Sequence, residues 1–154
     1  MNKINLKTIK GKKNFDAVFN KKRIFPSKKL IAIVNFRDIE QLSFSENQQT
    51  EEIIIYYAVL ISKRLSKKAV VRNRIKRLLR ESIKRVISES IENPLVFENI
   101  ILSWKEKAPH HPKLIGLSDV IPSVSEALEE AYSFYITKQR KKLEADSITI
   151  NQDV

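Results

Sequence analysis

Positively charged side chains concentrate between Lys63 and Arg85, at spacings that suit the binding of phosphates. This stretch holds eleven Lys or Arg residues and a single acid, Glu81, so its formal charge is +10. Arg presents a planar fork of donors that matches phosphate oxygens, and Lys adds a point charge. The chemistry that these residues suggest is therefore the binding of a polyanion rather than the making or breaking of a bond.

The spacing of apolar residues predicts that a helix over residues 70–91 carries these cations. Ile75, Leu79 and Val86 fall on one face at 100° per residue, whereas Arg77 and Arg80 fall on the opposite face. One side of the helix can then pack on the protein while the other presents cations. The amide of Asn73, which can both donate and accept hydrogen bonds, suits a base edge or a 2′-hydroxyl. The candidate RNA-binding residues are Lys63, Arg64, Lys67, Lys68, Arg72, Asn73, Arg74, Lys76, Arg77 and Arg80.

A solvated helix face is the simpler interpretation of such a charge run. Ordinary solvated faces mix acids and bases, with Glu and Lys four residues apart. Here Glu81 is the only acid among eleven cations, so the repulsion between the cations is uncompensated without a polyanion. Nucleic-acid binding is the better interpretation. A DNA-binding helix module is less consistent with the sequence, because no short helix-turn-helix precedes the basic helix.

Charge elsewhere in the chain supports a local positive field. Residues 1–30 carry ten Lys or Arg and one acid, whereas residues 31–62 and 86–154 each carry a net −4. Two segments therefore supply all of the excess in a total formal charge of +11. Such segregation builds a binding surface rather than a uniformly charged one.

Several classes of protein are excluded or disfavoured by composition. The chain has no cysteine, and its two glycines, Gly11 and Gly116, are too far apart for a phosphate-binding loop. No apolar run reaches the ~20 residues of a membrane helix, so we expect a cytoplasmic protein without a membrane or small-molecule partner. Adjacent His110 and His111 diverge and make a poor metal pair, and the serines lack the setting of a hydrolase nucleophile.

Periodicity and turn residues predict one α+β domain over residues 1–143. A small mixed sheet and its helices should form a two-layer sandwich in the order α-β-β-α-β-α. Besides the basic helix, the expected elements are a helix over 6–22, strands over 28–37, 53–62 and 95–104, and a helix from Pro122–Ser123, with a Ser123–Glu126 capping box, to Lys138–Lys142. An acidic loop over 38–52, a loop over 105–121 and a disordered tail over 144–154 complete the prediction.

The basic segment resembles a known family. Residues 68–81, KAVVRNRIKRLLRE, look like the signature of the bacterial ribonuclease P protein component, and the Ser62-Lys63-Arg64 lead-in is similar too. The resemblance covers roughly residues 6–142 and includes the order of elements. The turn at residues 65–68 departs from the family, since it lacks the glycine that is common there.

The resemblance implies a fold and a function. A ribonuclease P protein binds a catalytic RNA and assists the endonucleolytic removal of the 5′ leader from precursor tRNA. The catalytic centre and its Mg²⁺ are expected in the RNA, so no cofactor and no catalytic residue are expected in the protein itself. A cleft between the sheet and the first helix would hold the leader. Phe15 and Phe19 match aromatic residues that face this cleft, although their i,i+4 spacing suits a core stripe equally well.

Two other hypotheses explain part of the same pattern. A ribosomal or other structural RNA-binding protein without a processing role would account for the charge, but not for the residues that form the family signature. A self-contained protein nuclease is less consistent, because no carboxylate cluster lies near the basic segment in the sequence to hold Mg²⁺.

Overall fold

The computed structural model describes residues 4–38 and 52–152, with side chains to residue 146. The acidic loop predicted over 38–52 lies outside the described residues, apart from its first and last positions. No described helix combines the length and apolar character that crossing a membrane requires.

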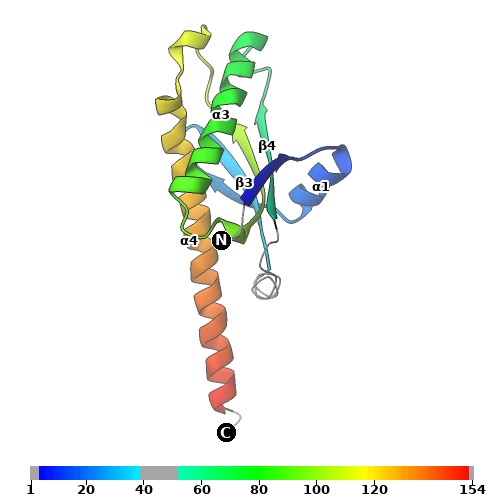
Figure 1. Ribbon diagram of the computed structural model, residues 1–154, viewed down its shortest axis with the longest axis vertical. Helices are drawn as coiled ribbons and strands as arrows, with labels where there is room; N and C mark the ends of the chain where they lie inside the picture. Colours follow the sequence, from blue (N-terminus) through cyan, green and yellow to red (C-terminus); the bar gives the residue numbers. More distant parts are fainter. Residues whose placement is uncertain (1–3, 39–51, 153–154) are drawn as a thin grey trace.

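A five-stranded mixed sheet forms the centre of the molecule (Figure 1). Its order is β1-β4-β5-β3-β2, in which β1, β4 and β5 run parallel while β3 and β2 pair antiparallel. The strands are β1 (Ile4–Thr8), β2 (Arg23–Pro26), β3 (Leu30–Phe36), β4 (Ile53–Ile61) and β5 (Phe97–Trp104).

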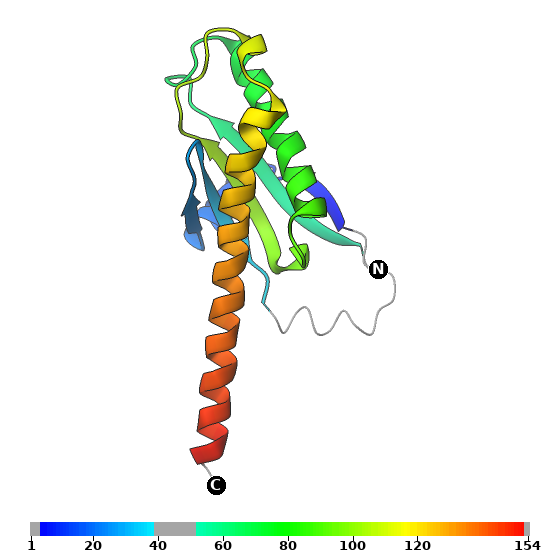
Figure 2. The same ribbon diagram turned by 90° about the vertical axis from the view of Figure 1, so that its left-hand side faces the viewer.

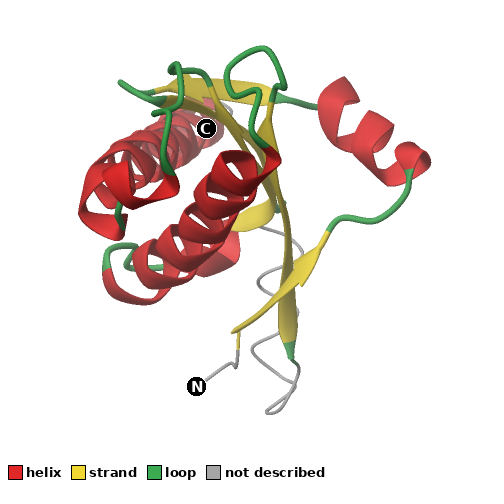
Figure 3. Cartoon of the chain, turned by 90° about the horizontal axis from the view of Figure 1, so that it is seen from above, coloured by secondary structure: helices red, strands yellow, loops and turns green. Residues whose placement is uncertain are grey.

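Helices lie on both faces of this sheet. Figure 3 shows α3 and α4 together on one face and α1 alone on the other. The described helices are α1 (Lys12–Asn20), α3 (Ala69–Glu89) and α4 (Leu117–Gln152), with short 3₁₀ turns η2 (Pro94–Val96) and η3 (Pro112–Leu114). The predicted α+β class with a mixed sheet is confirmed, and α1 adds a partial third layer to the expected sandwich.

The main core lies between the sheet and the helices α3 and α4. Alternate residues of β4, such as Ile55 and Val59, belong to the same core as the apolar stripe of α3, which packs on this strand; Ile75, Leu79 and Ile83 of the stripe are completely buried. Burying one such side chain contributes about 1.5–3 kcal/mol. The stripe therefore fixes α3 with its opposite, cationic side toward solvent.

A smaller core holds α1 against the other face of the sheet. Val18 of α1 packs with Ile33, Ala58 and Ile101, one residue from each of the three central strands. These strand residues alternate with those of the main core, so both faces of the central strands are apolar. The long apolar runs in β4 and β5 follow from this two-sided burial.

The N-terminal segment differs from its prediction. Residues 4–8 form strand β1 beside β4, and the helix predicted over 6–22 spans only Lys12–Asn20. Gly11 precedes the helix with φ +86°, a backbone region that favours glycine, and so separates strand from helix. The helical prediction merged the two because a five-residue edge strand and a nine-residue helix are too short to show separate periods. Strand β2 was missed for a similar reason, since its four residues include Pro26.

Helix α4 is longer at both ends than the sequence predicts. It begins at Leu117, where the Asp119 carboxylate accepts a hydrogen bond of 2.8 Å from the Gly116 N–H, and Pro122 lies inside it. The Ser123–Glu126 capping box is therefore wrong. Pro122 has no N–H to donate to the carbonyl of Ser118, four residues earlier in the helix. Because Ser118 is exposed, the helix tolerates the loss of this one hydrogen bond.

The helix also replaces the predicted tail. It continues to Gln152 and projects beyond the sheet in Figure 2, so the prediction of a disordered segment from residue 144 is wrong for residues 144–152. Strong helix formers such as Lys, Arg, Leu, Glu and Ala fill residues 140–145 and extend the helix although the described side chains from residue 140 to 146 are exposed.

Candidate nucleic-acid interface

The solvent side of α3 carries an open row of cations. Arg77, Arg80 and Lys84 are exposed, while Ile75, Leu79 and Ile83 on the opposite side are buried. Across α3 the described structure contains one ion pair, between Glu81 and Arg85 at 3.5 Å, both about half exposed. The remaining cations of this surface keep their charge available to an anion.

Three of the predicted RNA-binding side chains hold neighbouring backbone as well. The Arg72 guanidinium donates to the Ser66 carbonyl at 2.8 Å, and Lys68 Nζ donates to the His110 carbonyl at 3.0 Å. Arg74 donates through Nε and Nη2 to the Ile115 carbonyl, both at 3.3 Å. These cations therefore brace the start of α3, with only part of their donor sets left for a ligand.

The other seven predicted residues have side chains without a hydrogen-bond or ion-pair partner in the described part of the chain. All are exposed except one, which is half-buried. They lie before α3 and along the helix as far as Arg80. At the start of α3, the N-cap Lys68 makes no side-chain cap and the first turn has no acid. The unpaired N–H groups and the positive end of the helix dipole add to the attraction for phosphate. The seven are Lys63, Arg64, Lys67, Asn73, Lys76, Arg77 and Arg80.

The turn that precedes α3 is supported by the segment between β5 and α4. The Leu65 carbonyl accepts a hydrogen bond of 3.0 Å from the Ala108 N–H, in addition to the bonds made by Lys68 and Arg74. No non-glycine residue in the described chain has a positive φ, so the turn at residues 65–68 needs no glycine. The long segment after β5, to which the sequence assigns no role, thus holds the basic surface in place.

Phe15 and Phe19 lie half-buried on one flank of α1. They pack against the smaller core, as do Ile31 of β3 and Leu60 of β4. Both of these strand residues have Ser103 as their register partner, in the row next to the end of β4. Because β4 leads directly into Lys63, Ile31 and Leu60 lie near the end of the sheet from which the basic segment starts.

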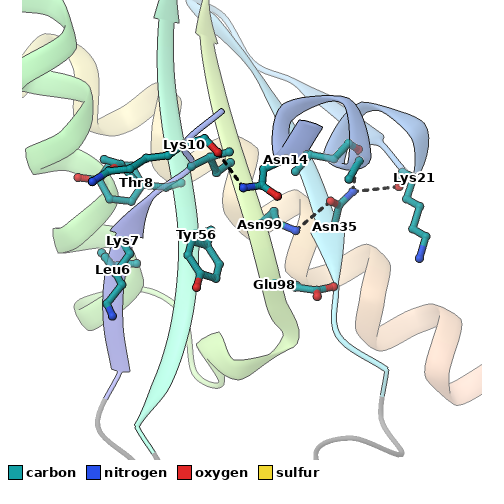
Figure 4. A pocket seen from close by; sticks show the side chains of 14 residues that line it. Leu6, Lys7, Thr8, Lys10, Asn14, Lys21, Asn35, Tyr56, Glu98 and Asn99 are labelled. Carbon is teal, nitrogen blue, oxygen red and sulfur yellow. Dashed lines mark hydrogen bonds between the residues drawn. The ribbon is translucent and has the colours of Figure 1, made fainter. Parts of the chain in front are cut away.

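A polar cleft of about 800 Å³ lies along the other flank of α1, between α1, β1 and the sheet (Figure 4). The predicted Phe15 and Phe19 do not line it. Its polar lining was missed by the sequence prediction, although Asn35 and Asn99 stand out as polar residues within apolar strands. The residues that line it are Leu6, Lys7, Thr8, Ile9, Lys10, Asn14, Ala17, Val18, Lys21, Asn35, Tyr56, Tyr57, Glu98 and Asn99.

Buried Asn35 ties α1 to the sheet at the bottom of this cleft. Its Nδ2 donates to the carbonyls of Val18 and Lys21 at the end of α1, each at 3.1 Å, and its Oδ1 accepts from Asn99 Nδ2 at 3.1 Å. Nearby, Arg37 donates to the Ile54 carbonyl; burial lowers the pKa of Arg37, and Glu98 opposes that shift. The hydrogen bonds of Asn35 fix the helix whose two flanks carry the aromatic and the polar surfaces.

Metal ligation finds no support among the described side chains. They contain no group of three or more His, Cys, Asp or Glu that could hold an ion. His111 instead accepts a hydrogen bond of 3.1 Å from the Lys113 N–H.

Fold and surface together define a basic α+β protein built to bind a polyanion. Residues 5–116 match the family model described as Ribonuclease P. The chain belongs to the ribonuclease P protein family, and it is thereby an RNA-binding component of a ribonucleoprotein in tRNA processing. No curated protein sequence gives a significant match.

Solved structures show the same fold. The chain resembles the RNase P protein of Staphylococcus aureus with a TM-score of 0.53 and 21% identity, covering 80% of this chain and 94% of that one. A mutant of the Staphylococcus aureus protein, described as having defective mRNA degradation activity, matches with the same TM-score and identity over 86% of its length. The expected family and fold are confirmed.

Proposed function

We propose that this chain is the protein subunit of ribonuclease P, which binds the catalytic RNA through α3 and assists removal of the 5′ leader from precursor tRNA. The observation that supports this most is the exposed, largely unpaired cationic side of α3 within the family-matched region. Folded RNA displays a phosphate backbone that such a row can bind with little sequence readout.

The leader is proposed to bind beside Phe15 and Phe19. Aromatic rings stack on the splayed bases of single-stranded RNA. Both rings are half-buried rather than fully enclosed, so part of each remains accessible. A strand of RNA on this flank would lie between α1 and the basic segment that begins at Lys63.

The chemistry of cleavage is assigned to the RNA. The described protein residues offer no cluster of carboxylates for Mg²⁺, so we place the metal ions and the catalytic centre in the RNA subunit. The protein contributes binding energy and orientation of the substrate. Such a complex belongs in the cytoplasm, where precursor tRNA is found in bacteria.

A binding measurement separates this role from that of a structural RNA-binding protein. The complex of the protein with ribonuclease P RNA should bind precursor tRNA more tightly than mature tRNA. Without the protein, the two affinities should converge. Equal affinities for the two tRNAs in the presence of the protein would favour the structural alternative.

A further inference from the structure

The projecting end of α4 carries a cluster of cations that is separate from the basic surface of α3. Lys138, Arg140, Lys141 and Lys142 are all exposed, and none of them forms an ion pair within the described part of the chain. The cluster lies beyond residues 5–116, which match the family model. What it binds must therefore be argued from its own position on the helix.

One side of α4 changes from apolar to cationic where the helix passes the end of the sheet. Its buried stripe ends at Tyr135, the last buried residue among the described side chains of this helix. The Tyr135 hydroxyl donates to the Arg37 carbonyl, just after β3, at 3.3 Å. Lys138 and Lys142 continue the same stripe at helical spacing, but both are exposed. Figure 2 shows this part of α4 projecting beyond the sheet.

Three of the four cations share this side of the helix. At about 100° per residue, Lys138, Lys141 and Lys142 fall within an arc of roughly 100°. Arg140 lies roughly 150° from the centre of that arc. The side of α4 that meets the sheet within the domain therefore presents three lysines to solvent once the sheet has ended.

The stability of the helix does not account for this cluster. Cations stabilise a helix through its dipole only within the last turn, whereas α4 continues to Gln152 and has no basic residue in its last turn. Like charges three or four residues apart, such as Lys138 and Lys142, destabilise a helix. A polyanion bound against this side would remove the repulsion between the lysines.

The position of α4 indicates which RNA its lysines can reach. Figure 3 shows α3 and α4 on the same face of the sheet, opposite α1 and its aromatic flank. Arg74 of α3 donates to the Ile115 carbonyl, just before α4, at 3.3 Å. With a rise of about 1.5 Å per residue, Lys141 lies roughly 35 Å along α4 from Leu117. A large folded RNA bound to α3 can span this distance, whereas a leader strand on α1 lies on the other face.

We propose that the lysine side of α4, formed by Lys138, Lys141 and Lys142, binds the phosphate backbone of the catalytic RNA at a second contact, remote from α3. The inference rests on the proposed function, because that function supplies the RNA. Lysine offers a point charge without a fixed geometry, so the contact is with phosphates rather than with particular bases. It lengthens the footprint of the protein on the RNA and adds to the affinity that α3 provides.

Neutralising the lysine side tests this inference in the full-length protein. Lys138→Gln, Lys141→Gln and Lys142→Gln are combined in one variant, because glutamine removes the charge and remains a good helix former. The slope of log affinity for ribonuclease P RNA against log salt should become shallower by about three contacts. Arg140→Gln, on the other side of the same helix, is the matched control and should change the slope by less than about one contact. The melting temperatures of both variants should equal that of the unaltered chain, since the replaced side chains are exposed.

The possible outcomes separate this inference from the proposed function. An unchanged slope in the triple variant would overturn the inference, and the proposed function would survive if variants of α3 still lowered the slope. A lower melting temperature with unchanged RNA affinity would also overturn it, because the lysines would then serve the fold. Weaker binding of precursor tRNA to the preformed complex, with unchanged binding of ribonuclease P RNA, would place the lysines on the substrate and contradict the choice of partner.

Discussion

At Arg77 and Arg80, two guanidinium groups face solvent with no partner in the described structure. If each contacts a phosphate, each releases counterions when RNA binds. Arg77→Ala and Arg80→Ala should each lower the slope of log affinity against log salt by about one contact. Binding to ribonuclease P RNA, titrated at several salt concentrations, measures that slope.

Arg85→Ala supplies the matched control for these variants. Arg85 lies on the same helix and already pairs with Glu81 at 3.5 Å. Its removal should change the slope less than removal of Arg77 or Arg80. An unchanged slope in both of the latter variants would remove this side of α3 from the interface.

Phe19 tests the aromatic flank. Phe19→Ala should weaken binding of precursor tRNA about five- to a hundredfold through the lost stack, yet leave binding of mature tRNA nearly unchanged. Because the ring also packs on the smaller core, the melting temperature should fall as well. Phe134→Ala, a half-exposed aromatic of the other layer, should lower stability without a leader-specific defect. If Phe19→Ala lowered the melting temperature but left the binding of precursor tRNA unchanged, leader stacking would be contradicted.

Individual residues show how far the sequence could predict the site. The basic composition and the 100° spacing identified the exposed side of α3, because both are local properties of the chain. The roles of Arg72 and Arg74 depend on where carbonyls lie in the folded chain. Arg74 bonds to Ile115, 41 positions away, and no local pattern encodes such a contact. Asn35 was overlooked because its two acceptors appear only once α1 has docked on the sheet.

Helix α1 depends on Asn35 for its attachment. Asn35→Ala leaves two carbonyls at the end of α1 and the Asn99 amide without their partner, which should lower the free energy of unfolding by about 1–3 kcal/mol. Denaturant titration measures the loss. Asn5→Ala, which removes a hydrogen bond of 2.6 Å to Glu52 at an exposed position, should cost less. Equal losses in the two variants would show that Asn35 does not anchor the helix.

The projecting end of α4 should contribute little to the stability of the domain. Its described side chains from residue 140 to 146 are exposed, so they bury no core. Ending the chain after Leu143 should therefore change the free energy of unfolding by less than about 0.5 kcal/mol, as for surface changes in general. A large drop in the melting temperature of the truncated chain would show that the domain extends past residue 143.

Elements were predictable where they are long and strongly patterned. The predicted bounds of α3 and β4, residues 70–91 and 53–62, nearly match the observed ones. Each element is long enough to repeat its pattern of residue types several times. Edge strands β1 and β2 have too few residues to establish a period, and pairing with β4 and β3 decides their conformation. The hydrogen bond between the Gly116 N–H and the Asp119 carboxylate stabilises the start of α4 at Leu117. Pro122 had led the sequence analysis to predict a later start for this helix.

In the whole molecule, the sheet separates surfaces of different chemical character on its two faces. The face covered by α3 and α4 supports the cationic row, and the face covered by α1 supports the aromatic flank and the polar cleft. A subunit arranged in this way could bind a folded RNA on one side and a single strand on the other. This separation predicts that variants of α3 and variants of α1 impair different RNAs.

Cleavage of precursor tRNA tests the central claim most directly. Ribonuclease P RNA and precursor tRNA are incubated at low Mg²⁺ with and without the protein, and the 5′ ends of the products are mapped. If the protein is the ribonuclease P subunit, it should strongly enhance cleavage at the mature 5′ end, and Arg77→Ala combined with Arg80→Ala should reduce that enhancement. Cleavage of equal rate with and without the protein, under conditions where it binds the RNA, would contradict the account.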